Sequence, residues 1–315
     1  MWLAYSVLAA VCFGFRGILY QWTSQKPIER NLMLLGVYLS GAVVSVSAAA
    51  MLGQSYTPAV WTGAFMGFFS FISNAAIYKG FAVGKASLVA VFTALTPIVV
   101  ASLSYIRWGE SLSPMQAVAF AVILAGIVII RYSSDLSWKN LQGVQWALLA
   151  MVTFGITDVA SKQAMLWQAD KLPTLVIMYG TGAVLFFLLW YGGRLKERRM
   201  VSRAKQEVAV TSLGGEMHTE AVTAAFREKQ KVANWPVAKT IGWGGIVGLS
   251  NISGMVFIMQ AFSLGITGLV SAVVTTNVLL ILLYARIVLK ERWSLHQIIG
   301  ICCALAGVLG LRLLE

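Results

Sequence analysis

Apolar stretches of about 20 residues alternate with short polar segments along most of the chain. That length is what an α-helix needs to cross the hydrocarbon core of a bilayer. Runs such as residues 117–130 lack the strict alternation of apolar and polar positions that a membrane barrel strand shows. The pattern predicts an all-α, polytopic membrane protein with ten transmembrane helices, at residues 2–22, 32–52, 59–78, 86–105, 114–130, 144–165, 172–191, 240–259, 267–285 and 295–311.

Composition excludes a water-soluble globular protein. Hydrophobic residues make up 58% of the chain and charged residues only 11%, with a mean hydropathy of +0.77, whereas soluble domains carry about a quarter charged residues. The net charge of +12 comes from basic residues between the apolar stretches, which indicates contact with anionic membrane lipid and no nucleic-acid partner. The first apolar stretch lacks the basic segment and cleavage site of a signal peptide, so we expect it to be a retained span.

The cysteines give no sign of a metal site or a disulfide framework. Cys12, Cys302 and Cys303 all lie inside apolar stretches, there is no CxxC motif, and the chain has only two histidines. Metal sites and disulfide scaffolds need clustered or regularly spaced ligands. We therefore expect no metal and no cofactor.

The sequence repeats itself at two offsets. Phe13-Gly14 corresponds to Phe154-Gly155, at an offset of 141, whereas Ser113 and Gln116 correspond to Ser294 and Gln297, at an offset of 181. The difference is 40 residues, which places an insertion inside the second copy. The predicted units are residues 1–131 as the first five-helix repeat, 143–312 as the second, and 192–238 as a hydrophilic insertion between the seventh and eighth helices.

Five helices per repeat is an odd number, so consecutive repeats must enter the membrane in opposite directions. An inverted repeat is an architecture typical of secondary transporters, whose halves rock about a site near the membrane midplane. Within the insertion, residues 219–232 place apolar and charged side chains on opposite helical faces. This segment is either a surface-lying helix or a solvated connector.

Several motifs resemble those of the drug/metabolite transporter superfamily, specifically its ten-span EamA-type members. The resemblance covers nearly all of the chain outside the insertion, and Val278 replaces the family proline at the place that matches Pro97. The motifs are Gly84-x-x-Ser87-Leu88-Val89, Leu95-x-Pro97, Gly109-Glu110-x-Leu112-Ser113-x-x-Gln116 and Gly126-Ile127.

The resemblance implies a multi-pass protein of the cell (inner) membrane that transports a small organic solute, often by exchange or with protons. It implies a cavity between spans 1, 3, 4, 6, 8 and 9, a hinge at Pro97 and close packing of the fifth and tenth spans. A solute and membrane lipids are then the expected partners, and the oligomeric state is a monomer or a homodimer.

Three ionisable residues lie deep inside predicted spans, where such groups usually mark a pathway or a buried pair. Arg16 lies in the first span, and Asp158 and Lys162 lie one turn apart in the sixth. Either they line the central cavity, or Asp158 only neutralises Lys162 or Arg16 as a structural pair. Two basic groups against one acidic group favour a substrate with a carboxylate or a phosphate.

A second set of candidates is polar and uncharged. Asparagine is the stronger indicator, because its amide must be satisfied inside hydrocarbon, whereas serine and threonine often bond only their own helix. The candidates for substrate binding or coupling are Asn74 and Tyr78 in the third span, Thr93 and Thr96 in the fourth, Asn251 in the eighth and Asn277 in the ninth.

The leading functional hypothesis is a secondary active transporter and not an enzyme. No G-x-x-x-x-G-K-[ST] motif for ATP is present. The alternatives are a membrane-embedded enzyme acting on a lipid or lipid-linked group, and a lipid-head-group flippase. An enzyme would need an activated group at a membrane boundary, but Glu110 and Glu291 have basic neighbours, Arg107 and Arg292, which favours structural pairing.

The charges and the family resemblance predict opposite orientations. Of the 24 Lys and Arg residues, 19 fall on the side that holds residues 21–31 and 192–239, and three fall on the side of the two termini. Basic loops stay in the cytoplasm, so the charges place both termini outside. The resemblance implies that both termini are inside. Ser113 with Gln116, and Ser294 with Gln297, additionally predict helix-capping boxes.

Overall fold

The computed structural model describes residues 1–24, 26–83, 86–131, 143–211, 235–288, 290 and 294–314. Every regular element in these ranges is a helix, which confirms the all-α prediction. The elements are α1 (Trp2–Ser24), α2 (Arg30–Met51), η1 (Pro58–Trp61), α3 (Thr62–Val83), α4 (Ala86–Ala94), α5 (Thr96–Trp108), α6 (Pro114–Arg131), α7 (Val144–Leu166), α8 (Lys171–Thr211), α10 (Val237–Leu264), α11 (Thr267–Val274), η3 (Thr275–Asn277), α12 (Val278–Ile287) and α13 (Leu295–Leu313).

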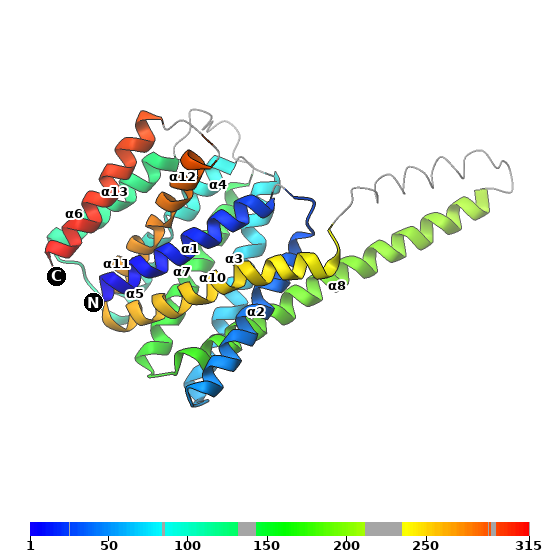
Figure 1. Cartoon of the computed structure of the whole chain (residues 1–315), viewed down its shortest axis with the longest axis horizontal. Helices are drawn as coiled ribbons and strands as arrows, with labels where there is room; N and C mark the ends of the chain where they lie inside the picture. The colour runs from blue at the N-terminus through cyan, green and yellow to red at the C-terminus, as the bar shows by residue number, and fades with distance from the viewer. Residues whose placement is uncertain are drawn as a thin grey trace.

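The helices form one bundle, with α6 and α13 side by side along one edge (Figure 1). Within the described ranges, nine helical segments are long and apolar enough to cross a membrane, and Pro114–Ile130 of α6 is a shorter apolar helix. Large apolar side chains such as Phe65 and Val118 lie exposed on the outside of the bundle. An outward apolar surface of this kind is what contact with lipid requires, and the protein is an integral, multi-pass membrane protein.

The fourth and ninth predicted spans are each broken near their middle. In the fourth, α4 ends at Ala94 and α5 begins at Thr96, with Pro97 in the first turn of α5. Proline lacks an amide and clashes with the preceding turn, which accounts for the break. In the ninth, the 3-10 turn η3 interrupts the helix at the corresponding place, although Val278 replaces the proline. The break in the ninth span therefore does not depend on a proline, and the hinge at Pro97 stays a prediction.

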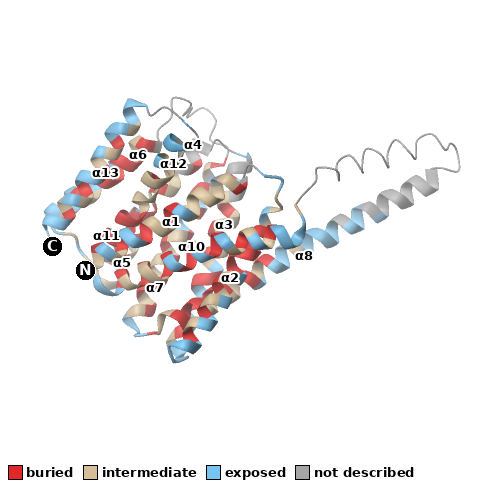
Figure 2. Cartoon of the chain, in the orientation of Figure 1, coloured by how far each residue is buried: buried red, intermediate tan, exposed pale blue. Residues whose placement is uncertain are grey.

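The seventh span is much longer than predicted. α8 continues without interruption to Thr211, 41 residues in all, so the first part of the predicted hydrophilic connector is helix. This part projects from the bundle (Figure 1), and its residues up to Ser202 whose burial is described are exposed (Figure 2). The rest of the predicted insertion up to residue 234, including the amphipathic segment 219–232, lies outside the described residues.

Small residues let helices approach closely where lipid removes the hydrophobic drive for packing. Gly126 of α6 faces the backbone of α13: a Cβ atom added there would lie 2.6 Å from both the amide nitrogen of Ala304 and the carbonyl oxygen of Gly300. This agrees with the implied packing of the fifth and tenth spans against each other.

Gly126→Ala is expected to destabilise the folded protein, because the added methyl group meets backbone atoms that cannot move aside. Overpacking of this kind costs about 1–3 kcal/mol. Thermal unfolding of the purified protein in detergent measures the effect. Gly310→Ala in α13 is the matched control, since its added Cβ atom would find its nearest neighbour 3.9 Å away. Equal unfolding temperatures for both variants would contradict the packing argument.

The two predicted repeats contact each other in a reciprocal way. Tyr38 of α2 packs against Gly182 of α8, and Tyr179 of α8 packs against Gly41 of α2. Both tyrosines and both glycines are related by the offset of 141 seen in the sequence. Such reciprocal contacts are those expected of an inverted repeat, and they support that architecture, which stays a prediction.

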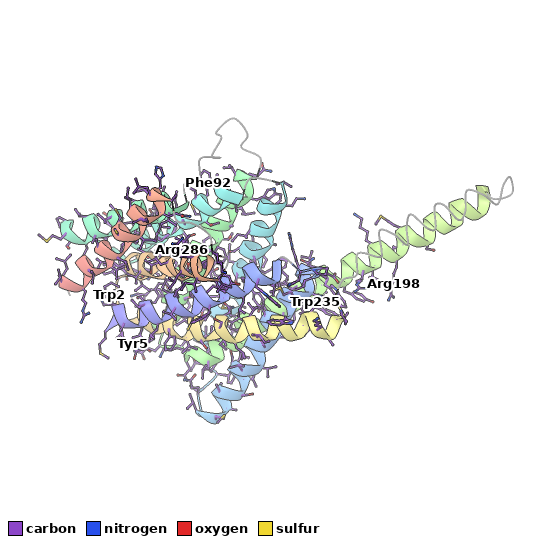
Figure 3. The ribbon with its side chains drawn as sticks, turned by 45° about the horizontal axis from the view of Figure 1, so that its top comes forward. Trp2, Tyr5, Phe92, Arg198, Trp235 and Arg286 are labelled. Carbon is purple, nitrogen blue, oxygen red and sulfur yellow. The ribbon has the colours of Figure 1, made fainter. Side chains whose placement is uncertain are left out.

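The two ends of the chain lie at the same end of the bundle (Figure 1). Trp2 marks that end, and Trp235 lies at the opposite end, where α1 ends and α10 begins (Figure 3). There, the rings of Trp22 and Trp243 pack with centroids 4.5 Å apart, as expected of aromatic residues at a membrane interface. We refer below to the terminal end and the α8 end of the bundle.

Both predicted capping boxes are present. Their serine hydroxyls accept bonds from the glutamine backbone amides, and the glutamine side chains accept bonds from the serine backbone amides. These residues begin α6 and α13 and take no part in the site described below.

Candidate functional site

A cavity of about 290 Å³ lies in the middle of the bundle, among side chains from helices of both predicted repeats. Its lining includes α1, α2 and α3 from the first repeat and α7, α10 and α11 from the second. On α1 the lining residues run from Phe13 to Tyr20, in the half nearer the α8 end. The remaining polar lining residues are Tyr38, Ser70, Asn74, Thr93, Thr96, Thr157, Asp158, Asn251, Ser271, Thr275 and Asn277.

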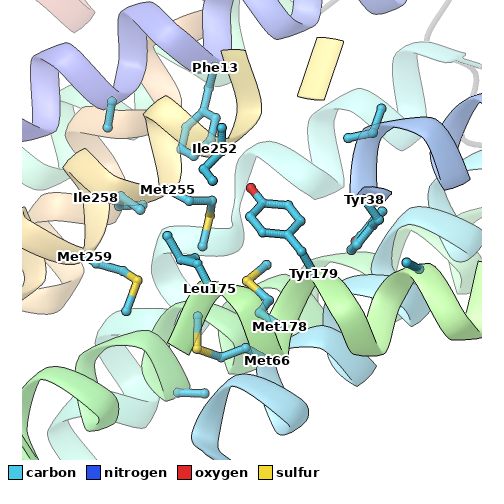
Figure 4. Packing of buried hydrophobic residues seen from close by; sticks show 14 of the residues in the cluster. Phe13, Tyr38, Met66, Leu175, Met178, Tyr179, Ile252, Met255, Ile258 and Met259 are labelled. Carbon is cyan, nitrogen blue, oxygen red and sulfur yellow. The ribbon is translucent and has the colours of Figure 1, made fainter. Parts of the chain in front are cut away.

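The guanidinium group of Arg16 reaches this cavity from α1. Its Nη1 donates a hydrogen bond of 2.6 Å to Oδ1 of Asn251 on α10, and the group lies over the Phe13 ring, 4.5 Å from the ring centroid. Nδ2 of Asn251 donates in turn to the hydroxyl of Tyr179 at 3.0 Å. Figure 4 shows Tyr179 extending from α8 towards Ile252 and Phe13. Arg16 is therefore held in place by neutral groups.

A related set of bonds surrounds Tyr38 on α2. Its hydroxyl shares a hydrogen bond of 2.6 Å with Oγ of Ser70 and accepts one of 3.2 Å from Nδ2 of Asn74. Ser70 corresponds to Asn251 at the offset of 181. The bond between Tyr38 and Ser70 thus repeats the bond between Tyr179 and Asn251, and the rings of the two tyrosines meet edge to face at 5.7 Å.

Asp158 of α7 lines the same cavity and also has a neutral partner. Its Oδ2 accepts a hydrogen bond of 3.0 Å from the hydroxyl of Ser271 on α11. Within the described ranges, no ion pair joins Asp158 to Arg16 or to Lys162. The predicted alternative of a structural pair between Asp158 and a neighbouring basic residue has no direct contact behind it in this conformation, and it stays a prediction.

Lys162 was also predicted as a possible lining residue of the central cavity. The structure corrects this prediction, because Lys162 does not line the cavity. Its Nζ lies 3.2 Å from Oε1 of Glu110 and donates to the carbonyl oxygens of Phe262 and Gly265, at 2.7 and 2.9 Å. The long side chain carries its charge from α7 to the terminal end of the bundle, where the carbonyls at the C-terminus of α10 attract a cation.

The sequence position of Glu110 favoured a pair with Arg107, but Glu110 pairs with Lys162 instead. Its Oε2 accepts a bond of 2.8 Å from the backbone amide of Thr267, the first residue of α11. One carboxylate thus joins the start of α11 to Lys162 of α7. Glu291 and Arg292, the corresponding predicted pair, lie outside the described residues.

The threonine, proline and asparagine candidates lie around the break in each half. Thr93 and Thr96 line the cavity, and their hydroxyls bond carbonyl oxygens of the same segment, at 2.9 and 2.8 Å. Pro97 is buried beside Thr96 in the first turn of α5, and Asn277 lines the cavity from η3. The side chain of Tyr78 lies outside the described residues.

Several lining residues were not predicted from the sequence. Tyr38, which lines the cavity, and Tyr179, which bonds the lining residue Asn251, carried a signal, because they are tyrosines at matching positions of the repeat. Ser271 and Thr157 resembled the many hydroxyl residues that bond only their own helix. Phe13, Met255 and Ile258 carried no signal in the sequence that would mark them as lining residues, since apolar residues occur on every face of a membrane helix. Within the described ranges, no group of three or more His, Cys, Asp or Glu residues could hold a metal ion.

Comparisons with known proteins agree with this architecture. One solved structure, titled "Crystal structure of protein", superposes with a TM-score of 0.70 over 99% of this chain and 96% of its own, at 15% sequence identity, and so shows the same fold. No curated protein matches the sequence. The profile of the EamA-like transporter family matches residues 1–132 and 221–313, which is more than half of the chain. The protein therefore belongs to the EamA-like transporter family, within the drug/metabolite transporter superfamily.

Proposed function

We propose that the protein is a secondary active transporter that moves a small organic solute by alternating access, by exchange or with protons. The observation that carries the proposal is the central cavity, which presents charged and amide side chains from both predicted repeats in the middle of a membrane bundle. Polar groups in such a place are costly and usually mark a transport pathway. The cavity is the solute site in this proposal.

The breaks in the fourth and ninth spans supply the flexibility that alternating access needs. Leu95 in one half and η3 in the other interrupt the helices at matching positions, and Thr96 and Asn277 line the cavity beside them. Broken helices at the substrate site are a recurring feature of transporters built from inverted repeats. A rocking motion of the halves about these points would expose the cavity first at one end and then at the other.

The ion pair between Lys162 and Glu110 supports closure at the terminal end. The lysine side chain is only 8% exposed and the glutamate side chain 18%, and together they link α7, α11 and the end of α10. We infer that this pair holds the terminal end closed in the present conformation and separates when that end opens.

The two alternative functions are less well supported. A membrane enzyme would need an activated group at a boundary, but Glu110 is engaged by Lys162 and the amide of Thr267. The paired carboxylates expected of hydrolytic chemistry are not among the described cavity residues. A lipid-head-group flippase is a transporter too and differs only in the solute.

Uptake by the purified protein in proteoliposomes tests the proposal. Solutes from a metabolite library are offered with and without a proton gradient, and the contents are analysed for chemically altered products. Accumulation of an unaltered solute is the expected result. Product formation without accumulation would favour the enzyme, and movement of labelled lipid head groups alone would favour the flippase.

We propose that residues 192–238 lie in the cytoplasm and both termini outside, in the cell (inner) membrane. The positive charges support this orientation: the projecting part of α8 alone carries Arg194, Lys196, Arg198 and Arg199. Ser212→Cys, in a background that lacks Cys12, Cys302 and Cys303, is therefore expected to resist a membrane-impermeant thiol reagent in intact cells. Labelling after lysis is the control, and labelling without lysis would restore the orientation implied by the family.

A further inference from the structure

Three tryptophan rings meet at the α8 end of the bundle, where α1 ends and α10 begins. The ring of Trp22 lies 6.2 Å from that of Trp235 and 4.5 Å from that of Trp243, and the latter two lie 6.3 Å apart, measured between centroids. Figure 3 shows Trp235 near the point where α8 leaves the bundle. We call these three residues the tryptophan cluster. Because indole rings prefer the headgroup layer, the cluster marks the depth of that layer.

Two lysine side chains lie on this cluster. Nζ of Lys26 is 5.1 Å from the centroid of the Trp22 ring, and Nζ of Lys239 is 4.1 Å from the centroid of the Trp235 ring. Both lysines are exposed, whereas the rings are partly buried. The face of an indole ring attracts a cation and so holds each ammonium group in place. An ammonium group has three N–H donors, so those that point away from the ring are available to a further partner.

No carboxylate neutralises these two charges. Among the residues that the structure describes, the ion pairs join Lys162 to Glu110 and Arg194 to Glu29. Glu29 is the acidic residue nearest to Lys26 in the sequence, and it is engaged by Arg194. The cluster therefore presents two uncompensated positive charges at one place on the membrane interface, and the partner that complements them is an anion.

Exposed apolar side chains continue from the cluster towards the middle of the membrane. Ile246 and Leu249 of α10 are exposed, and Ile246 follows Lys239 by seven residues, which places it on the same helical face. On α1, exposed Phe15 precedes Trp22 by seven residues in the same way. A soluble anion would contact only the lysines. A phospholipid would use both features, because its head carries the anion and its acyl chains are apolar.

We propose that Lys26 and Lys239, together with the tryptophan cluster, bind the headgroup of an anionic phospholipid whose acyl chains lie along the exposed faces of α1 and α10. A zwitterionic phospholipid also has a phosphate, but it brings a cation that the two lysines repel, so the site selects for net negative charge. The bound lipid joins the end of α1 to the start of α10. The site lies on the outside of the bundle and does not rest on the proposed transport function.

The proposed orientation agrees with this site. The α8 end then faces the cytoplasmic leaflet, whose anionic lipids give it a negative surface potential that attracts basic residues near the membrane. The lipid is expected to stabilise the packing of α1 against α10, because it contacts the folded arrangement of the two helices and not the unfolded chain. The two helices bring Arg16 and Asn251 into contact beside the cavity, so the lipid also supports that contact.

Thermal unfolding of the detergent-purified full chain tests the proposal. Dioleoyl phosphatidylglycerol, which is anionic, is compared with dioleoyl phosphatidylcholine, which has the same acyl chains and no net charge. Phosphatidylglycerol is expected to stabilise the protein at a lower mole fraction, and each lysine should contribute about fivefold to this preference. Lys26→Gln and Lys239→Gln should each remove one such factor, and the double variant should remove the preference.

Arg198→Gln is the matched control. It removes the same charge from an exposed position on the projecting part of α8, away from the cluster (Figure 3), and it should keep the full preference. Equal losses in Arg198→Gln and Lys239→Gln would show a general attraction between charges and overturn the site. Lys239→Arg keeps the charge and should keep the preference. If the double variant fails to fold, the single variants decide the question.

A second measurement locates the lipid and identifies its class. Phosphatidylglycerol with brominated acyl chains should quench the tryptophan fluorescence more than brominated phosphatidylcholine does, and this excess should disappear in the double variant. Equal quenching by the two lipids in the unchanged protein would overturn the proposal. Inorganic phosphate and polyglutamate are offered in place of lipid. Stabilisation by phosphate equal to that by phosphatidylglycerol would assign the lysines to a soluble anion, and equal stabilisation by polyglutamate would assign them to an acidic protein, so either result would overturn the lipid site.

Discussion

Asp158→Asn is expected to abolish transport, or to remove its dependence on the proton gradient, in a protein that still folds. Asparagine has nearly the same shape, and its carbonyl oxygen can still accept the hydrogen bond from Ser271. The substitution removes only the negative charge that faces the cavity. Arg16 then remains as the one charged residue in the described lining, so protons and cationic groups are repelled.

Proteoliposome uptake over a range of pH values measures this effect, with the thermal unfolding temperature as the check on folding. Asp170→Asn is a matched control, because Asp170 lies outside the cavity and bonds the amide and hydroxyl of Ser55, at 2.7 and 3.0 Å. It should leave transport intact. An unchanged rate and pH profile in Asp158→Asn would rule out a role for this charge in binding or coupling.

Lys162→Met is expected to destabilise the protein more than the loss of any exposed ion pair. The substitution leaves the mostly buried carboxylate of Glu110 without its cation, and it leaves the carbonyls of Phe262 and Gly265 without a donor. Breaking a buried pair by removing one partner costs about 3–5 kcal/mol. The double variant with Glu110→Gln removes both charges and should recover part of the loss.

The pair between Arg194 and Glu29 provides the comparison, because its side chains are 44% and 31% exposed. Exposed pairs contribute about 0–1 kcal/mol, so Arg194→Met should scarcely change the unfolding temperature. The unfolding temperature in detergent is measured for the unchanged protein, Lys162→Met, the double variant with Glu110→Gln, and Arg194→Met. If Lys162→Met is as mild as Arg194→Met, the network at the terminal end contributes no more than a surface contact.

The same variants test whether this pair closes the terminal end. A cysteine at Ser271, which lines the cavity from α11, is introduced into a background without the three native cysteines. Labelling by an impermeant reagent added from the terminal side should be faster in the Lys162→Met, Glu110→Gln double variant. Unchanged labelling in a folded double variant would mean that other contacts close this end.

The positions of the helices could be predicted from the sequence because the bilayer leaves a chain few choices. Inside hydrocarbon every backbone amide and carbonyl must be satisfied within the protein, so an apolar stretch of sufficient length becomes a helix. The capping boxes at Ser113 and Ser294 likewise depend only on residues three positions apart. The starts of the predicted spans therefore agree closely with the observed helices, for example at Pro114 and Leu295.

Predictions that depended on a partner distant in the sequence were less secure. Asp158 and Lys162 are one turn apart on α7, and proximity along the helix suggested that they act together. The side chain of Lys162, the longer of the two, instead reaches the terminal end of the bundle, where Glu110 and the last carbonyls of α10 are available. No local pattern indicates that these groups meet, since they are brought together only by the packing of α7, α10 and α11.

The sequence by itself thus determined the membrane class, the all-α fold, most of the helix positions and the residues that stand out as candidates, because these follow from hydrophobic length and local spacing. Only the tertiary structure decided which candidates share the cavity. It separated Lys162 from Asp158, joined Arg16 to Asn251 and Tyr179, and broke the ninth span at η3 without a proline. The physical reason is that side-chain reach and helix packing select each polar group's partner, and neither property is local in the sequence.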